Sequence, residues 1–317
     1  MHAILSVLSL LLGVAVILAG NGLIGTLLGV RGQLEGISAS TLGVVMSGYF
    51  VGYMIGTFQV PKMIRRTGHI RTFAALASVA SVVVLLHGLY VHAAPWFALR
   101  MVSGFCIVGL YIVIESWLNG QTENAQRGHV FSAYMTTTLI GLGAGQLMLM
   151  AGDVSRLELF AVGSVLLSLG LVPVAMTRVR EPVLMDASRL GLRRLFAVSP
   201  LGFVACVASG LSTGAFWSLG SVYAAEVGLE TRGIAAFMGL TILGGILMLW
   251  PMGRLSDRFE RRKILALVCG LAAAGALLTA LLTGVDDYGI LIGGFCYGAF
   301  APQSFQRPKS EFRKPDG

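Results

Sequence analysis

The fold is decided by the stretch Gly253-Arg254-Leu255-Ser256-Asp257-Arg258-Phe259-Glu260-Arg261-Arg262-Lys263, which lies between two long apolar runs. It carries five arginines or lysines and two acids, although charged residues make up only 12% of the chain. Gly253 has no Cβ, so a helix that passes there can pack closely against a neighbour. Asp257 lies near the start of the next expected helix, where its charge suits the helix dipole and nearby arginines can pair with it. Two interpretations are open: a basic cytoplasmic loop, or a charged gate.

The composition is that of a membrane protein. The 317 residues are 56% hydrophobic with a mean hydropathy of +0.81. Soluble domains carry about 25% charged residues, roughly twice the fraction found here. Glycine, with 42 residues, suits helices that pack closely in lipid. All four cysteines fall inside apolar runs, without metal-ligand or disulfide spacing, and we interpret them as packing residues: Cys106, Cys206, Cys269 and Cys296.

Apolar segments divide the chain into membrane helices. Most of them reach the roughly 17–25 residues that a helix needs to cross a bilayer, and they are too long and too unpatterned for barrel strands. The first has no basic flank and exceeds a signal-peptide core, so we expect a retained helix rather than a signal peptide. The segments, of which only the last is too short to span, are Ala3–Leu28, Leu42–Val60, Phe73–Val91, Pro95–Leu118, Val130–Met150, Leu157–Met176, Leu201–Ala224, Ile234–Met252, Ile264–Leu282 and Tyr288–Ala301.

The distribution of lysine and arginine predicts the orientation. With the N-terminus inside, 19 of the 23 basic residues fall in the inner loops and the polar C-terminal tail, and only three, Arg31, Arg156 and Arg232, fall outside. The remaining one is Arg100, inside the fourth segment. The net charge of +8 therefore faces the cytoplasm and anionic lipid, and not nucleic acid.

An internal repeat appears when the chain is shifted by 192 residues. The first segment then falls on the seventh and the second on the eighth, and both copies start inside, which predicts parallel repeats about an axis along the membrane normal. We expect an N-terminal six-helix bundle over 1–177, a cytoplasmic linker over 178–200 and a partial second bundle over 201–301. The matched pairs in the second segment are Met46 with Met238, Gly52 with Gly244, Arg66 with Arg258, and Arg71 with Lys263.

The repeat predicts two further helices after the fourth helix of the second copy. Residues 302–317 are instead polar and contain prolines, and such a sequence cannot complete a membrane helix. We expect about ten segments, with a truncation or frame shift near Ala301 and an aberrant tail. A natural ten-helix variant is the alternative.

The charged stretch, read as G-x-x-x-D-R-x-x-R-R-K, resembles the loop between helices 8 and 9 of major facilitator superfamily transporters. It departs from the family pattern at Glu260, where glycine is usual. The resemblance implies an all-α fold of two parallel-repeat six-helix halves, the second incomplete here. It also implies a cytoplasmic gate motif made of Gly253, Asp257, Arg258, Arg261 and Arg262.

Further segments extend this resemblance to Ala301. Leu99-Arg100-x-x-x-Gly104 resembles the fourth-helix pattern that the family ties to proton coupling. The run from Glu115 to Asn119 resembles the YcaD-like branch. Gly141-x-Gly143-x-Gly145 resembles the fifth helix of antiporters, without its proline. The first copy of the loop, Pro61–Arg71, departs at Arg65, where the family has an acid.

Two ionisable residues lie inside the fourth segment, where a charge is costly and therefore suggests function. Arg100 and Glu115 are 15 residues apart, about 22 Å along one helix face, so both can face one cavity. Arg100 either acts in transport, by tuning a proton site or holding an anion, or extends its charged end to the membrane–water interface. Glu115 either carries a coupling proton or pairs with Arg127 or Arg66 as a gate.

Three further residues complete the candidate substrate-binding and coupling set. Asn21 and Gln146 are amides inside helices, and each can bond either a substrate or a neighbouring helix. Trp217 suits a cavity wall, although aromatic residues also form belts at the membrane surface. His87 we place at the outer interface.

The motifs of common enzymes and of ATP-driven pumps do not occur in the sequence. We expect no enzyme activity, no cofactor and no catalytic or metal site. The sequence and the resemblance together predict a secondary active transporter, working by alternating access and coupled to protons, in a bacterial inner membrane. Its partners would be a small-molecule substrate, protons and the lipid bilayer, with the protein as a monomer. An uncoupled facilitator, a membrane sensor and an inactive fragment are the alternatives.

Overall fold

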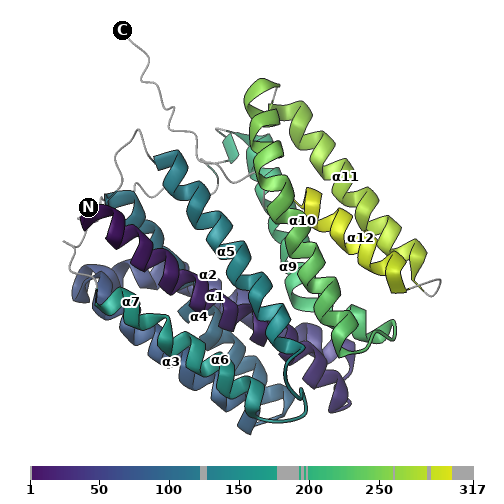
Figure 1. Cartoon of the computed structure of the whole chain (residues 1–317), viewed down its shortest axis with the longest axis horizontal. Coiled ribbons are helices and arrows are strands. Elements are labelled where there is room, and N and C mark those ends of the chain that lie inside the picture. The colour runs from purple at the N-terminus through teal and green to yellow at the C-terminus, as the bar shows by residue number, and fades with distance from the viewer. Residues whose placement is uncertain are drawn as a thin grey trace.

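The computed structural model describes residues 2–121, 127–176, 193, 196–197, 199–259, 261–283 and 287–301. Helices make up nearly all of this part of the chain, and it contains no strand (Figure 1). The predicted linker lies almost wholly outside these residues, as does the tail from 302 onward. The domain boundaries therefore stay a prediction.

Each apolar segment forms a helix, and the sixth forms two. Pro173 has no backbone N–H for the carbonyl of Leu169, so the sixth segment is interrupted at Gly170. The helices are α1 (His2–Leu34), α2 (Ala39–Thr67), α3 (His69–Leu89), α4 (Ala93–Gln121), α5 (Arg127–Leu149), α6 (Glu158–Leu169), α7 (Leu171–Ala175), α9 (Pro200–Glu226), α10 (Thr231–Arg258), α11 (Arg261–Leu282) and α12 (Asp287–Phe300).

Seven spans in the described residues are long and apolar enough to cross a membrane. Helix α5 is long enough at 23 residues but less apolar, the apolar part of α11 is Ala266–Leu282, and α12 has 14 residues. The predicted all-α membrane fold is confirmed. The seven spans are Leu8–Leu34, Ala39–Thr67, His69–Leu89, Ala93–Gly120, Glu158–Ala175, Gly202–Glu226 and Thr231–Leu249.

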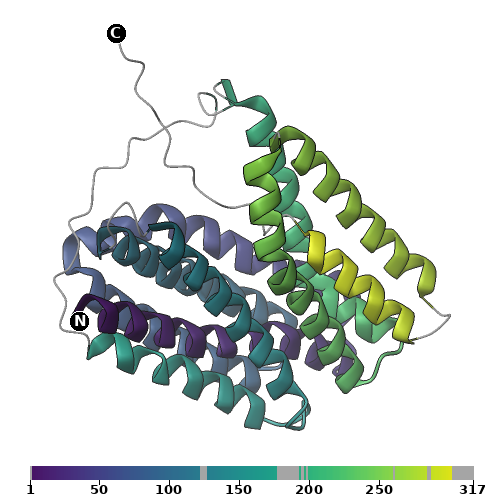
Figure 2. The ribbon, with the colours of Figure 1, turned by 45° about the horizontal axis from the view of Figure 1, so that its top comes forward.

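The helices form two bundles that lie side by side in both views (Figures 1 and 2). The first holds α1 to α7, drawn in purple to teal, and the second holds α9 to α12, drawn in green to yellow. Helix α2 packs mainly against α4, and α10 packs mainly against α12. These pairs correspond under the shift of 192 residues, so the repeat seen in the sequence recurs in the packing.

Glycines make both of these pairs close. A Cβ at Gly104 would collide with the backbone oxygen of Tyr49, and one at Gly298 would collide with that of Thr241. Thr241 follows Tyr49 by 192 residues, so the same close approach occurs in each bundle. Lipid offers no hydrophobic drive for helix association, and a residue without a side chain lets the two backbones touch.

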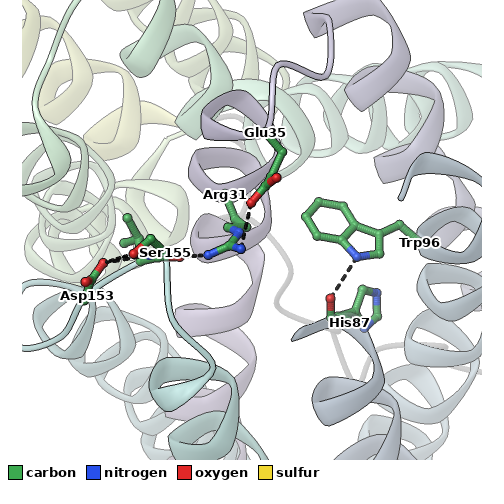
Figure 3. Close-up of polar contacts among 7 residues, drawn as sticks. Arg31, Glu35, His87, Trp96, Asp153 and Ser155 are labelled. Carbon is green, nitrogen blue, oxygen red and sulfur yellow. Dashed lines mark hydrogen bonds and ion pairs between the residues drawn. The ribbon is translucent and has the colours of Figure 1, made fainter. Parts of the chain in front are cut away.

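The end of α1 is fixed by polar contacts (Figure 3). Arg31 forms an ion pair with Glu35 at 2.7 Å and donates a hydrogen bond to the backbone oxygen of Val154 at 3.2 Å. In the same α5–α6 loop, Asp153 accepts hydrogen bonds from the backbone and hydroxyl of Ser155. The hydrogen bonds of Asp153 hold the pKa of its carboxyl below the usual value. Helix α1 is thereby tied to the loop that follows α5.

His87 is buried against neighbouring helices near the end of α3, and its place at the membrane interface stays a prediction. Its side chain is 0% exposed, and its Nδ1 bonds the carbonyl of Val83 at 2.8 Å. The indole Nε1 of Trp96 donates to the carbonyl of His87 at 2.9 Å (Figure 3). His87 and Trp96 thus hold the end of α3 against the start of α4.

Candidate functional site

A cavity of about 1010 Å³ lies between the two bundles. Its first wall comes from α1, α2, α4 and α5, and its second comes from α9, α10, α11 and α12. On α9 the lining begins at Ser199 and Gly202, next to the start of the helix, and ends at Ser218. The cavity therefore extends from the middle of the molecule to the end at which α1 and α9 begin.

At the opposite end the two bundles touch. The side-chain amide of Gln33 on α1 donates to the backbone oxygen of Val222 on α9 at 3.1 Å. Gly29, one turn earlier, faces Ser221 so closely that a Cβ at Gly29 would collide with the serine hydroxyl. The structure is thus open at one end of the cavity and closed at the other.

Arg100 lines the cavity as a buried cation without an acid beside it. Its side chain is 6% exposed, and its Cζ lies 4.7 Å from the ring centroid of Tyr49. Its Nε is buried without a hydrogen-bond partner, and no described acid lies within ion-pairing distance. A buried charge is costly unless it is paired, so Arg100 has a free capacity to bind a negative group.

Glu115 lines the same cavity, four turns along α4 from Arg100. Its carboxylate accepts a hydrogen bond from the hydroxyl of Tyr134 on α5 at 3.4 Å. Within the described part of the chain no cation pairs with it, and Arg66 is exposed. The side chain of Arg127, the other predicted partner, lies outside the described residues.

Tyrosines surround these two charges, and sequence reasoning missed them. Tyr49, Tyr53, Tyr111 and Tyr134 line the first wall. The rings of Tyr49 and Tyr53 lie 6.1 Å apart. A signal was present in the sequence, because Tyr49 and Tyr53 are four residues apart, as are Tyr111 and Glu115, and residues at this spacing share one helix face.

The second wall presents aromatic rings, hydroxyls and thiols, and its described lining carries no charge. Phe216 lies 5.5 Å from Trp217 and 5.6 Å from Tyr297, measured between ring centroids. The hydroxyl of Tyr297 and that of Ser212 are 2.8 Å apart, which fixes the tyrosine ring. The predicted residue Trp217 therefore belongs to a preformed aromatic wall.

Of the two predicted amides, Asn21 lines the cavity and Gln146 does not. Gln146 is 0% exposed. It accepts a hydrogen bond from the Thr26 hydroxyl at 2.8 Å and donates to the carbonyl of Gly22 at 3.0 Å. Both partners are on α1, so Gln146 joins α5 to α1, the second of the two roles that the sequence left open.

The predicted gate motif is placed only in part. Gly253, Asp257 and Arg258 belong to the last turns of α10, while Arg261 and Arg262 begin α11. The side chains of Asp257, Arg258, Arg261 and Arg262 lie outside the described residues. Among the described residues no group of histidines, cysteines and acids could hold a metal ion.

A family model described as Major Facilitator Superfamily matches residues 10–306. The chain belongs to the Major Facilitator Superfamily. Among its relatives is the uncharacterized MFS-type transporter YcaD of Escherichia coli O7:K1 (strain IAI39 / ExPEC), 27% identical over 273 residues, which cover 86% of this chain and 72% of the relative. YcaD of Escherichia fergusonii (strain ATCC 35469) is 26% identical over 279 residues, or 87% of this chain and 72% of the relative. The predicted resemblance to the YcaD-like branch is confirmed.

Solved structures agree with this Major Facilitator Superfamily fold. The nucleoside transporter NupG matches with a TM-score of 0.75 at 12% identity, over 94% of this chain and 80% of that one. A D-xylose-proton symporter matches with a TM-score of 0.65 at 16% identity, over 94% and 78%. The protein is thus a multi-pass membrane protein that acts in transport, and not an enzyme.

Proposed function

We propose that the protein is a secondary active transporter that moves a small solute by alternating access and couples this movement to protons. The observation that carries the proposal is a cavity between the two bundles. The described residues leave it open at one end, and the contact of Gln33 with Val222 closes the other. Rocking of the two bundles about this cavity would close the end that is now open and open the end that is now closed. We further propose a monomer in a bacterial inner membrane, with the open end toward the cytoplasm.

Glu115 is the proposed carrier of the coupling proton. It is the one acid in the described cavity lining. A carboxylate held among tyrosines, with no described cation paired to it, can gain and lose a proton as its exposure changes. The alternative of a gate residue paired with Arg127 or Arg66 would hold in another state of the cycle. A neutral amide at position 115 separates the two roles. It abolishes proton dependence if Glu115 carries the coupling proton, and it does not if Glu115 is only a gate residue.

Proteoliposomes with an imposed pH gradient test this function. A panel of radiolabelled organic acids, nucleosides and sugars is offered, and accumulation above the external concentration is measured with and without a protonophore. We expect the wild type to accumulate one class only while the gradient lasts. The Glu115→Gln variant should lose accumulation but keep exchange of internal for external solute, because exchange needs no net proton movement.

The matched control is Glu158→Gln, since Glu158 is an exposed acid at the start of α6. It should behave as the wild type. An uncoupled facilitator would instead equilibrate the solute in every variant without response to the protonophore, and that result would refute the proton coupling while leaving transport in place.

A further inference from the structure

The starting point is the guanidinium of Arg100. Its Cζ lies over the ring of Tyr49, 4.7 Å from the ring centroid. Its side chain is 6% exposed, it lines the cavity, and it makes no hydrogen bond with a described residue. A cation–π contact does not replace hydrogen bonds, and the planar guanidinium carries N–H donors along its edge that have no partner among the described residues. These edge donors fit the two oxygens of a carboxylate.

The rest of the described lining limits the charge of the ligand. Arg100 is the one basic residue in it, and Glu115 is the one acid. The two are 15 residues apart, about 22 Å along α4. One unpaired cation matches one negative charge, and a second negative group placed toward Glu115 would meet a carboxylate.

The aromatic residues limit the shape of the ligand. Five of the eight tyrosines of the chain line the cavity, together with Phe50, Phe216 and Trp217. They stand on both walls, with Tyr49 and Tyr53 facing the cavity from α2 and the fixed group of Phe216, Trp217 and Tyr297 facing it from the second bundle. Rings on opposite walls favour a flat body between them, through offset or edge-to-face stacking.

We propose that the cavity binds a small organic monoanion with a planar aromatic body, whose carboxylate takes the free edge of Arg100. This inference rests on the proposed transport function and specifies the substrate class of the same cavity. The volume of about 1010 Å³ admits a ligand with one or two rings. The carboxylate would supply the counter-charge that Arg100 lacks.

Two native cysteines allow the proposal to be tested without transport. Cys206 and Cys269 are exposed and line the cavity, whereas Cys106 is buried. Purified protein in detergent is treated with a maleimide at neutral pH, and the labelling of each cysteine is followed by mass spectrometry. The probes are 2-naphthoate and 2-naphthamide, which have the same rings and differ in charge.

We expect 2-naphthoate to slow the labelling of Cys206 and Cys269 in a saturable manner. The amide and the Arg100→Gln variant should each raise the concentration required about tenfold to a hundredfold, the range for a charged hydrogen bond. Arg100→Lys should fall in between, because an ammonium cannot bind both oxygens in one plane. The control Arg156→Gln, at an exposed arginine of the α5–α6 loop, should equal the wild type.

Equal protection by the amide and the acid, no protection by either, or an unchanged affinity in Arg100→Gln would overturn the proposal. Cys106 reports folding, because it stays unlabelled only in a folded protein. If Arg100→Gln fails to fold, the comparison of the two probes on the wild type still decides. Binding is measured without a membrane or gradient, so the result holds even if proton coupling fails. If only the neutral probe binds, the proposed substrate class is wrong while the proposed transport function is unaffected.

Discussion

The side-chain amide of Gln33 donates a hydrogen bond to the backbone oxygen of Val222, and this contact joins α1 to α9 at the closed end of the cavity. Glycine at position 29 lets the two helices meet one turn earlier, beside Ser221. Polar and close backbone contacts therefore join the two bundles at this end. The apolar core also continues across them, because Val222, Phe237 and Ile242 belong to the same buried cluster as the residues of the first bundle.

Gln33→Ala should shift the protein away from the state described here. Loss of one hydrogen bond costs about 1 kcal/mol, which is roughly a fivefold change in a two-state population. We expect slower maleimide labelling of Cys206 and Cys269, because more molecules would have the cavity open at the other end. The labelling rate follows the fraction of molecules in the described state, so it should slow by up to about fivefold. Gln59→Ala, at an exposed glutamine of α2, is the control, and equal labelling rates in both variants would contradict the prediction.

The proposed orientation predicts from which side the cavity is reached. In intact cells a membrane-impermeant maleimide should leave Cys206 and Cys269 unlabelled, whereas in inverted membrane vesicles both should react. Cys106 should stay unlabelled in both, because it is buried. Labelling of the cavity cysteines in intact cells would place the open end outside and reverse the proposed topology.

Gly104→Ala should destabilise the first bundle strongly. The added methyl group would collide with the backbone oxygen of Tyr49, which no rotamer change can relieve. Overpacking costs about 1–3 kcal/mol or more, so a clear loss of thermal stability in detergent is expected. Gly270→Ala, where a Cβ meets nothing within 4 Å, should leave the melting temperature equal or slightly higher, and similar losses in both variants would refute the close-packing argument.

Gln146→Leu should lower stability but not ligand binding. It removes the hydrogen bonds to Thr26 and Gly22 that join α5 to α1, and such bonds between membrane helices contribute about 0.6 kcal/mol on average and up to about 1.7. Thermal unfolding of Gln146→Leu, Thr26→Val and the double variant forms a cycle that measures their coupling. A loss of 2-naphthoate binding without a loss of stability would place Gln146 in the binding site instead.

The loop after α5 should contribute stability that depends on pH. The pKa of Asp153 is lowered from 3.8, mainly because its carboxylate accepts the hydroxyl hydrogen bond of Ser155. A carboxyl group whose pKa is lower in the folded than in the unfolded protein stabilises the folded state at pH values above the unfolded-state pKa. This stabilisation is lost as the pH falls through the folded-state pKa. The difference in melting temperature between wild type and Asp153→Asn should be small at pH 7 and shrink as the pH falls below 3.8. A difference that grows in acid would contradict this sign.

Apolar length was enough to predict the helices, because the bilayer sets the length of a helix that crosses it. The family was predicted from the resemblance of the stretch Gly253–Lys263 and of further segments such as Leu99–Gly104. The spacing of Arg100 and Glu115 was enough to place them on one face of α4. Tertiary contacts were not predictable in this way. Gln146 and Asn21 look alike in the sequence, yet only one meets the cavity, because the rotation of each helix about its axis depends on its neighbours.

His87 shows the same limit from the other direction. A histidine near a helix end suits the membrane interface, but its burial was not predicted, because it depends on the contact with Trp96 on the next helix. The tyrosines at four-residue spacing were readable in principle, since their period marks a helix face. Their position around Arg100 was not, because the partner face belongs to a helix about 50 residues away.

The two walls of the cavity differ in chemical character. Both lining charges in the described residues, Arg100 and Glu115, stand on α4, and the opposing wall from α9 to α12 offers rings, hydroxyls and thiols. The proposed proton coupling and recognition of the ligand's carboxylate could therefore evolve separately from selection of the rest of the ligand. Exchanging side chains on α9 would retune which molecules are accepted while the ionic machinery on α4 stays untouched, which makes the neutral wall the natural place to engineer a new cargo.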